Sequence, residues 1–259
     1  MYQKELTIAG EIQNSLLLEK VPDNLNSLDV AALTLPSQDF DGDFIDFFKF
    51  SENRFDLVVG DVMGKGLHAA MVGAGAKNRL SRVLWQLSLE GNPSALGPAQ
   101  IMETLRSALD SGLEHVEKFI TMVYASFDVD NQTMTFVDAG HTPILWYSTK
   151  ESIWHELKGS NVPLGLPHIR ECVPRTVTFS PGDYFLFYSD GLMDGRNAMG
   201  ETYQDNALMK CVDTLRDKNA KEFVKYLMAD HKKFVGKDHF FDDLTIVAVK
   251  ISPQKKKTP

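Results

Sequence analysis

The sequence predicts an α+β fold in which antiparallel sheets are covered by helices. Strand-like segments occur near both ends of the chain, and the helical segments are grouped between and after them. This order differs from the regular alternation of strands and helices that a doubly wound parallel sheet requires. The chain has 259 residues, of which 43% are hydrophobic, and this is enough to build a substantial core.

Two kinds of periodicity define the individual elements. Apolar and β-branched runs between turn residues predict strands, and apolar residues spaced three and four apart predict helices. In chain order we expect a helix over 2–20, strands over 28–35, 44–50 and 55–60, helices from 69 to about 90 and over 98–115, strands over 119–129, 132–139, 143–149, 172–179 and 183–189, helical segments between 204 and 235, and a strand over 244–251. The predicted organisation is an N-terminal helical linker or regulatory segment (1–22), one domain (23–252) and a basic tail (253–259).

Charge and composition exclude several classes of protein. A net charge of −8 argues against general nucleic-acid binding, which favours a basic face. No apolar run is long enough to cross a membrane, and the N-terminus does not resemble a signal peptide. Cys172 and Cys211 lack the spacing of a disulfide framework or a zinc-thiolate site. We therefore expect a cytoplasmic protein with no membrane or nucleic-acid partner.

Aspartates stand at the ends of four apolar strand segments. Asp43 lies in SQDFDGDFIDFFKF, Asp61 ends FDLVVGD, Asp190 ends DYFLFYSD, and Asp242 and Asp243 precede the last strand. A single aspartate beside a glycine is more often a turn residue than a functional one. Four such sites together indicate a bound cation, because buried carboxylates need compensating charge. Oxygen donors without His or Cys favour Mg²⁺ or Mn²⁺ over Zn²⁺, and two such ions can hold a phosphoryl group and activate water.

Other motifs in the sequence support alternative functions poorly. GDVMGKGL is one residue short of a phosphate-binding P-loop, and Gly66 occupies the place of the required Ser or Thr. DGDFI lacks the glutamate of the diguanylate cyclase signature. Ser189 has no G-x-S-x-G setting. His141, in DAGHTP, is better explained by a turn or core role than by metal binding.

Taken in order, the motifs resemble those of the PPM-type metal-dependent serine/threonine phosphatases, in their bacterial SpoIIE/RsbU-like branch. The similarity extends from about Glu11 to Ile251. The segments that carry it are EIQNSLL, DGDFIDFF, VVGDVMGKGLHAAM, FVDAGHTPILWY, VPLGL, PGDYFLFYSDGLMD and FDDLTIVAVK.

This resemblance implies an α-β-β-α sandwich, with two antiparallel sheets flanked by helices, and a centre of two Mn²⁺ or Mg²⁺ ions. The implied metal ligands are Asp43, Asp61 as the bridging carboxylate, the main-chain carbonyl of Val62, Asp190 and Asp242. The same four aspartates are the implied catalytic residues. Supporting roles are assigned to Asp41, Asp46, Asp194, which some relatives use for a third metal, and Asp243.

The implied reaction is hydrolysis of a phosphoserine or phosphothreonine monoester by a metal-bound hydroxide. In this branch the substrate is typically a phosphorylated STAS-domain anti-sigma-factor antagonist. The helix over 1–20 is expected to join an upstream sensor or to form a homodimer. Two residues depart from the family pattern: Asp41 replaces a glycine, and Met63 cannot supply a proton to the leaving group. Asp41 keeps open the alternative of a catalytically weak, phosphatase-like binding or signalling module.

Overall fold

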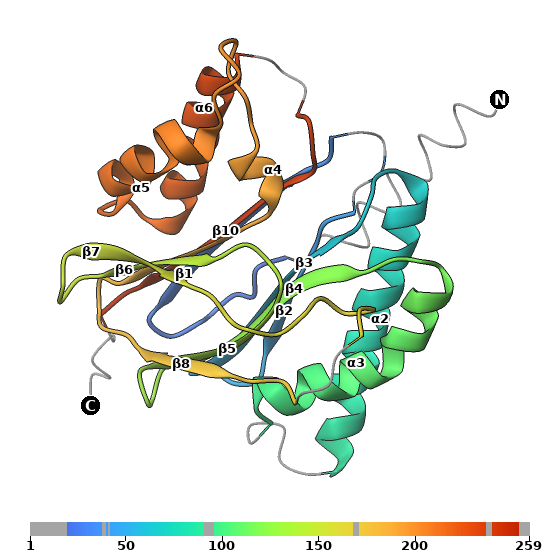
Figure 1. Cartoon of the computed structure of the whole chain (residues 1–259). Coiled ribbons are helices and arrows are strands. Elements are labelled where there is room, and N and C mark those ends of the chain that lie inside the picture. Colours follow the sequence, from blue (N-terminus) through green and yellow to red (C-terminus); the bar gives the residue numbers. More distant parts are fainter. Residues whose placement is uncertain are drawn as a thin grey trace, which may run out of the picture. The chain divides into compact units, whose positions relative to one another are not determined.

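The structure is a computed structural model of the chain (Figure 1). It describes residues 20–37, 40, 42–90, 96–167, 171–236 and 240–253. The predicted N-terminal helix, Asp41 and most of the basic tail lie outside these residues. The described residues form two compact units: unit 1 falls within 1–25, 39–141 and 158–178, and unit 2 within 26–38, 142–157 and 179–259.

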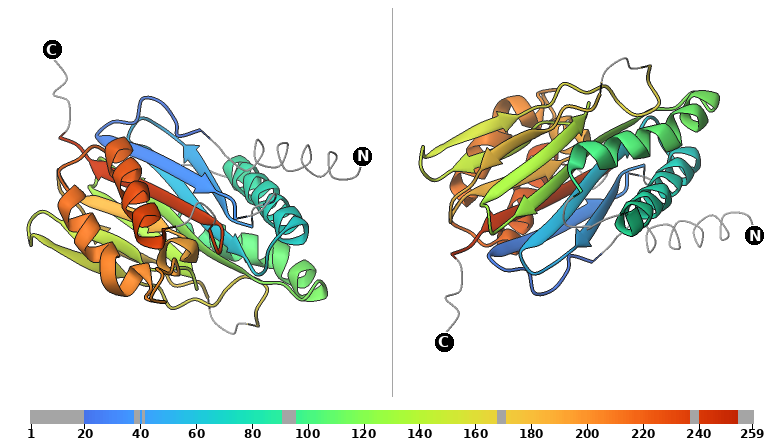
Figure 2. Two further views of the ribbon diagram at one scale, coloured as in Figure 1. Left: turned by 90° about the horizontal axis from the view of Figure 1, so that it is seen from above. Right: turned by 90° about the horizontal axis from the view of Figure 1, so that it is seen from below.

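Unit 1 is a five-stranded antiparallel sheet with two long helices. Its elements are β2 (Phe44–Lys49), β3 (Arg54–Val62), α2 (Leu67–Glu90), α3 (Pro98–His115), β4 (Ile120–Asp128), β5 (Thr133–Ala139) and β8 (Arg175–Thr178). The strands follow the order β2-β3-β4-β5-β8, so that sequential strands are neighbours until the final step. Helix α2 packs on β2 and β3, and α3 packs on β4 and β5. Figure 2 shows both helices on the same side of this sheet.

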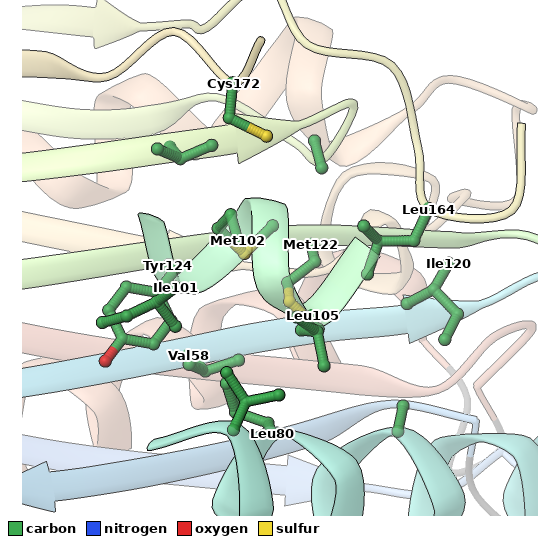
Figure 3. Packing of buried hydrophobic residues seen from close by; sticks show 14 of the residues in the cluster. Val58, Leu80, Ile101, Met102, Leu105, Ile120, Met122, Tyr124, Leu164 and Cys172 are labelled. Atoms are coloured by element: carbon green, nitrogen blue, oxygen red, sulfur yellow. The ribbon is translucent and has the colours of Figure 1, made fainter. Parts of the chain in front are cut away.

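Alternate residues of the strands in unit 1 face these helices. Val58 and Tyr124, which are partners across β3 and β4, pack with Leu80 of α2 and Met102 of α3 (Figure 3). These side chains are fully buried, and each large apolar side chain contributes about 1.5–3 kcal/mol by leaving water. Residues of the opposite parity, such as Val59, therefore lie on the other face of the sheet.

Unit 2 contains the second antiparallel sheet and the C-terminal helices. Its elements are β1 (Leu28–Leu35), β6 (Ile144–Ser148), β7 (Ile153–Leu157), β9 (Tyr184–Tyr188), α4 (Asp190–Met193), the π-helical turn η2 (Gln204–Leu208), α5 (Met209–Leu215), α6 (Ala220–Val235) and β10 (Leu244–Ile251). The strand order is β1-β10-β9-β6-β7. The first and last strands of the chain are thus direct neighbours, with Leu28 opposite Ile251.

Helix α6 covers the β1–β10 part of this sheet. Its limits follow from its end residues. The Asn219 side chain accepts a hydrogen bond from the Glu222 N–H, and Gly236 adopts a left-handed φ of 65° at the C-terminal end. The Asp29 carboxylate accepts a hydrogen bond from the Ala220 N–H at 2.8 Å, which fixes the start of α6 on β1.

The α+β prediction, with two antiparallel sheets flanked by helices, is confirmed. Strand β7 and the short helix α4 were not predicted from the sequence. Strand β7 is an edge strand whose residues are mostly exposed or half-buried, which weakens the apolar alternation. In the described part of the chain, no helix combines the length and apolar character needed to cross a membrane.

Candidate metal centre

Asp43 and Asp61 lie at one corner of the unit 1 sheet. The ladder between β2 and β3 pairs Phe44 with Gly60, and continuing this register by one residue sets Asp43 opposite Asp61. Directly opposed residues of an antiparallel pair share a face, with Cβ atoms about 4.5–5.5 Å apart. Phe44 faces α2, so both aspartates lie on the face that α2 and α3 do not cover. Asp43 is 2% exposed, and Asp61 is half-buried.

Small residues bring α2 close to the turn before Asp43. A Cβ atom on Gly42 would lie 3.3 Å from the Ala69 Cβ and 3.4 Å from the Val62 carbonyl oxygen. A Cβ atom on Gly73 would lie 3.3 Å from the Gly42 carbonyl oxygen. The GKGLHAAMVG segment therefore provides a small-residue helix face against this turn. As a result, the Val62 carbonyl, which is a predicted ligand, lies next to the turn that carries Asp43.

Asp46 lies on the other face of the sheet. Its strand partner is Val58, which packs toward α2, and its carboxylate is 4.0 Å from the Lys77 ammonium of that helix. Both side chains are almost fully buried. The Asp46 carboxylate also accepts a hydrogen bond from the Phe47 N–H at 2.9 Å. Asp46 therefore joins β2 to α2, whereas the sequence suggested a place beside Asp43.

Asp190 and Asp242 are brought toward each other by β9 and β10 in unit 2. The register pairs Tyr188 with Ile246, so the residues after β9 run alongside those before β10. The Ser189 hydroxyl accepts a hydrogen bond from the Thr245 N–H at 2.9 Å and donates one to the Asp243 carbonyl at 3.1 Å. Asp190 then begins α4 immediately after this double contact.

Gly191 determines how closely these two segments approach. A Cβ atom at this position would lie 2.1 Å from the Asp243 carbonyl oxygen and 3.2 Å from that of Asp242. Any side chain here would collide with main-chain atoms, so only glycine permits this packing. The glycine after Asp190 in the YSDGL motif is thus explained by a close approach of two backbones.

The two supporting aspartates of unit 2 have different surroundings. The Asp243 carboxylate is buried and accepts hydrogen bonds from both the N–H and the hydroxyl of Ser37, at 2.7 and 2.8 Å. Asp243 therefore ties the segment after β1 to the start of β10. Asp194 is exposed and follows the last residue of α4, and its N–H donates to the Asp190 carbonyl at 2.8 Å.

Each unit thus presents two of the predicted ligand carboxylates near strand ends. Within the described residues of either unit, no group of three or more His, Cys, Asp or Glu side chains is gathered to hold a metal ion. The donors are carboxylate and carbonyl oxygens, which suit Mg²⁺ or Mn²⁺ and not a thiophilic metal.

Sequence reasoning assigned no function to several residues that surround these aspartates. Thr121 pairs with Asp61 across β3 and β4, and its hydroxyl lies 2.9 Å from His141 Nδ1. Lys77 and Ser37 also contact supporting aspartates. Thr121, Lys77 and Ser37 lie at least 31 positions from the aspartates that they neighbour or contact, so only the folded structure brings these pairs together.

Comparisons with known proteins identify the chain as a phosphatase of the PPM type. A family model described as stage II sporulation protein E (SpoIIE) matches residues 51–252, and the chain belongs to this family. It is 26% identical over 249 residues to the phosphoserine phosphatase RsbU of Bacillus subtilis (strain 168), covering 96% of this chain and 70% of RsbU.

Solved structures agree with this assignment of the fold. The SiaA-PP2C domain of Pseudomonas aeruginosa has a TM-score of 0.80 and 19% identity, covering 96% of each chain. The catalytic domain of the serine/threonine phosphatase PstP, in complex with two manganese ions, has a TM-score of 0.61 and 17% identity. That match covers 87% of this chain and 99% of the PstP domain.

Proposed function

We propose that this chain hydrolyses phosphoserine or phosphothreonine in a protein substrate, with two Mn²⁺ or Mg²⁺ ions. The proposed ligands are Asp43, Asp61, the Val62 carbonyl, Asp190 and Asp242. The observation that carries the proposal is the register of β2 and β3, which sets Asp43 opposite Asp61 at a sheet corner. Two ionised carboxylates this close repel each other, and a divalent cation between them would offset that repulsion.

The protein would contribute a fixed set of oxygen donors. Strand pairing holds Asp43 and Asp61, while Ser189 and Gly191 hold the Asp190 turn against the start of β10. When bound, the two cations would neutralise phosphate charge and lower the pKa of a water molecule so that it can attack phosphorus as hydroxide. Under this proposal no side chain has to act as a nucleophile.

The family relationship supports a proposal for the substrate class. RsbU is named a phosphoserine phosphatase, and this chain aligns with most of its length. We therefore propose a phosphorylated STAS-domain protein as the physiological substrate, within a partner-switching pathway.

The helix predicted over 1–20 would connect the chain to a sensor or to a second copy of itself. Comparing sedimentation of the chain with and without residues 1–18 tests the second possibility, which predicts dimers only when the segment is present.

Asp61→Asn is the direct test of the metal centre. We expect at least about a 100-fold loss of Mn²⁺-dependent hydrolysis of a phosphoserine peptide, because even outer partners of metal ligands contribute about 10–100-fold. Calorimetric titration with Mn²⁺ alone should show weaker binding, and circular dichroism should show an intact fold. Asp217→Asn, which neutralises an exposed aspartate in unit 2, is the matched control and should behave as wild type. Wild-type turnover in Asp61→Asn would refute the ligand assignment.

A further inference from the structure

Three side chains form a row across one end of the unit 1 sheet. Asp61 of β3 is the register partner of Thr121 of β4, so their side chains lie on the same face. The Thr121 hydroxyl lies 2.9 Å from Nδ1 of His141, which follows β5. The row Asp61–Thr121–His141 therefore runs from a proposed metal ligand to a histidine that is distant from it in sequence.

The position of His141 is fixed by its backbone. Its N–H donates a hydrogen bond to the Asp138 carboxylate at 2.8 Å, and the same carboxylate accepts another from the Gly159 N–H at 2.8 Å. Gly140 has a left-handed φ of 73°, and a Cβ atom there would lie 2.7 Å from Pro163 Cγ. His141 is also only 8% exposed. The turn and its burial therefore restrict where the His141 ring can meet the Thr121 hydroxyl.

The contact between Thr121 and His141 constrains the threonine. A hydroxyl can donate to a ring nitrogen or accept from it, so the bond is compatible with either neutral tautomer of the histidine. Threonine is β-branched and has few χ1 rotamers. A hydrogen bond to a rigid partner therefore selects one rotamer of Thr121, the residue that pairs with Asp61 across β3 and β4.

We propose that His141 is a positioning residue for Asp61 and that it acts through the Thr121 hydroxyl. This inference rests on the proposed function, in which Asp61 is a metal ligand. Outer partners commonly orient the carboxylates that bind metals, and their loss lowers metal affinity or activity by about 10–100-fold. A purely structural histidine would instead affect folding stability and leave Mn²⁺ affinity unchanged.

Paired variants separate these two roles. Thr121→Val removes the hydroxyl and keeps the shape, whereas Thr121→Ser keeps the hydroxyl. His141→Ala removes the partner, whereas His141→Asn places a polar atom near the position of Nδ1. Thr135→Val is the matched control, because the Thr135 hydroxyl bonds Thr176 at 2.9 Å on the same sheet, on strands that do not carry Asp61.

Mn²⁺ affinity by calorimetry, without substrate, is the primary measurement, and urea denaturation reports stability. We expect Thr121→Val and His141→Ala each to weaken Mn²⁺ binding by about 10–100-fold. Thr121→Ser and His141→Asn should retain most of the affinity, and Thr135→Val all of it. The double variant Thr121→Val/His141→Ala should bind Mn²⁺ no more weakly than the single variant with the lower affinity, because the effects of residues in one network are not additive.

Three results would overturn the inference. Wild-type Mn²⁺ affinity in folded Thr121→Val would remove the role of the hydroxyl. Loss of turnover in both His141→Asn and His141→Ala, with Thr121→Val fully active, would mean that the histidine acts without the threonine. If Asp61→Asn also binds Mn²⁺ as wild type does, the proposed function fails and the inference fails with it. If Asp61→Asn loses binding while Thr121→Val keeps it, only the inference fails.

Discussion

Replacing Gly191 by alanine tests whether the close approach of two backbones places Asp190. The new Cβ atom would lie 2.1 Å from the Asp243 carbonyl oxygen, and a separation of 3.0 Å requires a shift of about 0.9 Å. Both sides of the contact are main chain, so no flexible side chain can absorb the shift. The α4 turn must therefore move away from the start of β10 and carry Asp190 with it.

The size of this effect follows from general magnitudes. Overpacking at a dense site costs about 1–3 kcal/mol of folding free energy. Displacing a reacting group by about 1 Å costs about 100-fold in rate. We therefore expect Gly191→Ala to lower the free energy of unfolding by about 1–3 kcal/mol and Mn²⁺-dependent kcat/KM by about 100-fold.

The assay compares two variants with the same chemical change. Urea denaturation gives the stability, and hydrolysis of a phosphoserine peptide at saturating Mn²⁺ gives kcat/KM. Gly75→Ala is the control, because its Cβ atom would have no neighbour within 4 Å on the exposed side of α2. Alanine favours a helix by about 0.5–1 kcal/mol over glycine, so this control should gain stability and keep its activity. Unchanged stability and kcat/KM in Gly191→Ala would refute the reasoning.

Two further predictions concern buried titratable groups. Burial lowers the pKa of His231 from 6.5 to about 4, so its contribution to stability is complete above pH 6.5 and is lost as the pH falls toward 4. When the pH falls from 7 to 5, the free energy of unfolding of His231→Gln should therefore decrease by about 2 kcal/mol less than that of wild type, as measured by urea titrations. Burial raises the pKa of Asp56 from 3.8 to about 6, against hydrogen bonds that include one from the Tyr124 hydroxyl at 2.6 Å. Its contribution to stability is present at low pH and is lost as the pH rises through 6. Between pH 4 and pH 7, the free energy of unfolding of Asp56→Asn should therefore decrease by about 2 kcal/mol less than that of wild type. Parallel plots of stability against pH for a variant and wild type would contradict the corresponding prediction.

Local sequence patterns were sufficient for most elements because their cause is local. Helix α6 has an amphipathic spacing, an asparagine cap and a terminal glycine, all within its own residues. Strand β10 is a buried apolar run of eight residues. Strand β7 was missed, since its position at the edge of a sheet, with His155 and Glu156 half-buried or exposed, gives no clear apolar alternation. Helix α4 is a single turn, too short to produce a period.

The candidate site was predicted less completely. Acids at strand ends are visible in the sequence, and so is the glycine after Asp190. The face on which each acid lies depends on strand register. Asp43 and Asp46 are three positions apart in one segment, yet they lie on opposite faces of the sheet, and Lys77 pairs with Asp46. Their odd spacing in an extended segment already predicts opposite faces, but only helix packing decides which of the two faces meets α2.

The sequence by itself determined the α+β class and the family, and it supplied the aspartates that we propose as metal ligands, because these depend on residue types and their order. Only the tertiary structure decided that Asp61 stands beside Thr121, that Thr121 meets His141, and that Asp46 belongs to the helix face. These relations join residues 20 to 60 positions apart, and they arise from hydrogen-bonded register and helix packing. Such contacts form only when the strands are paired, so their partners leave no mark in the local sequence.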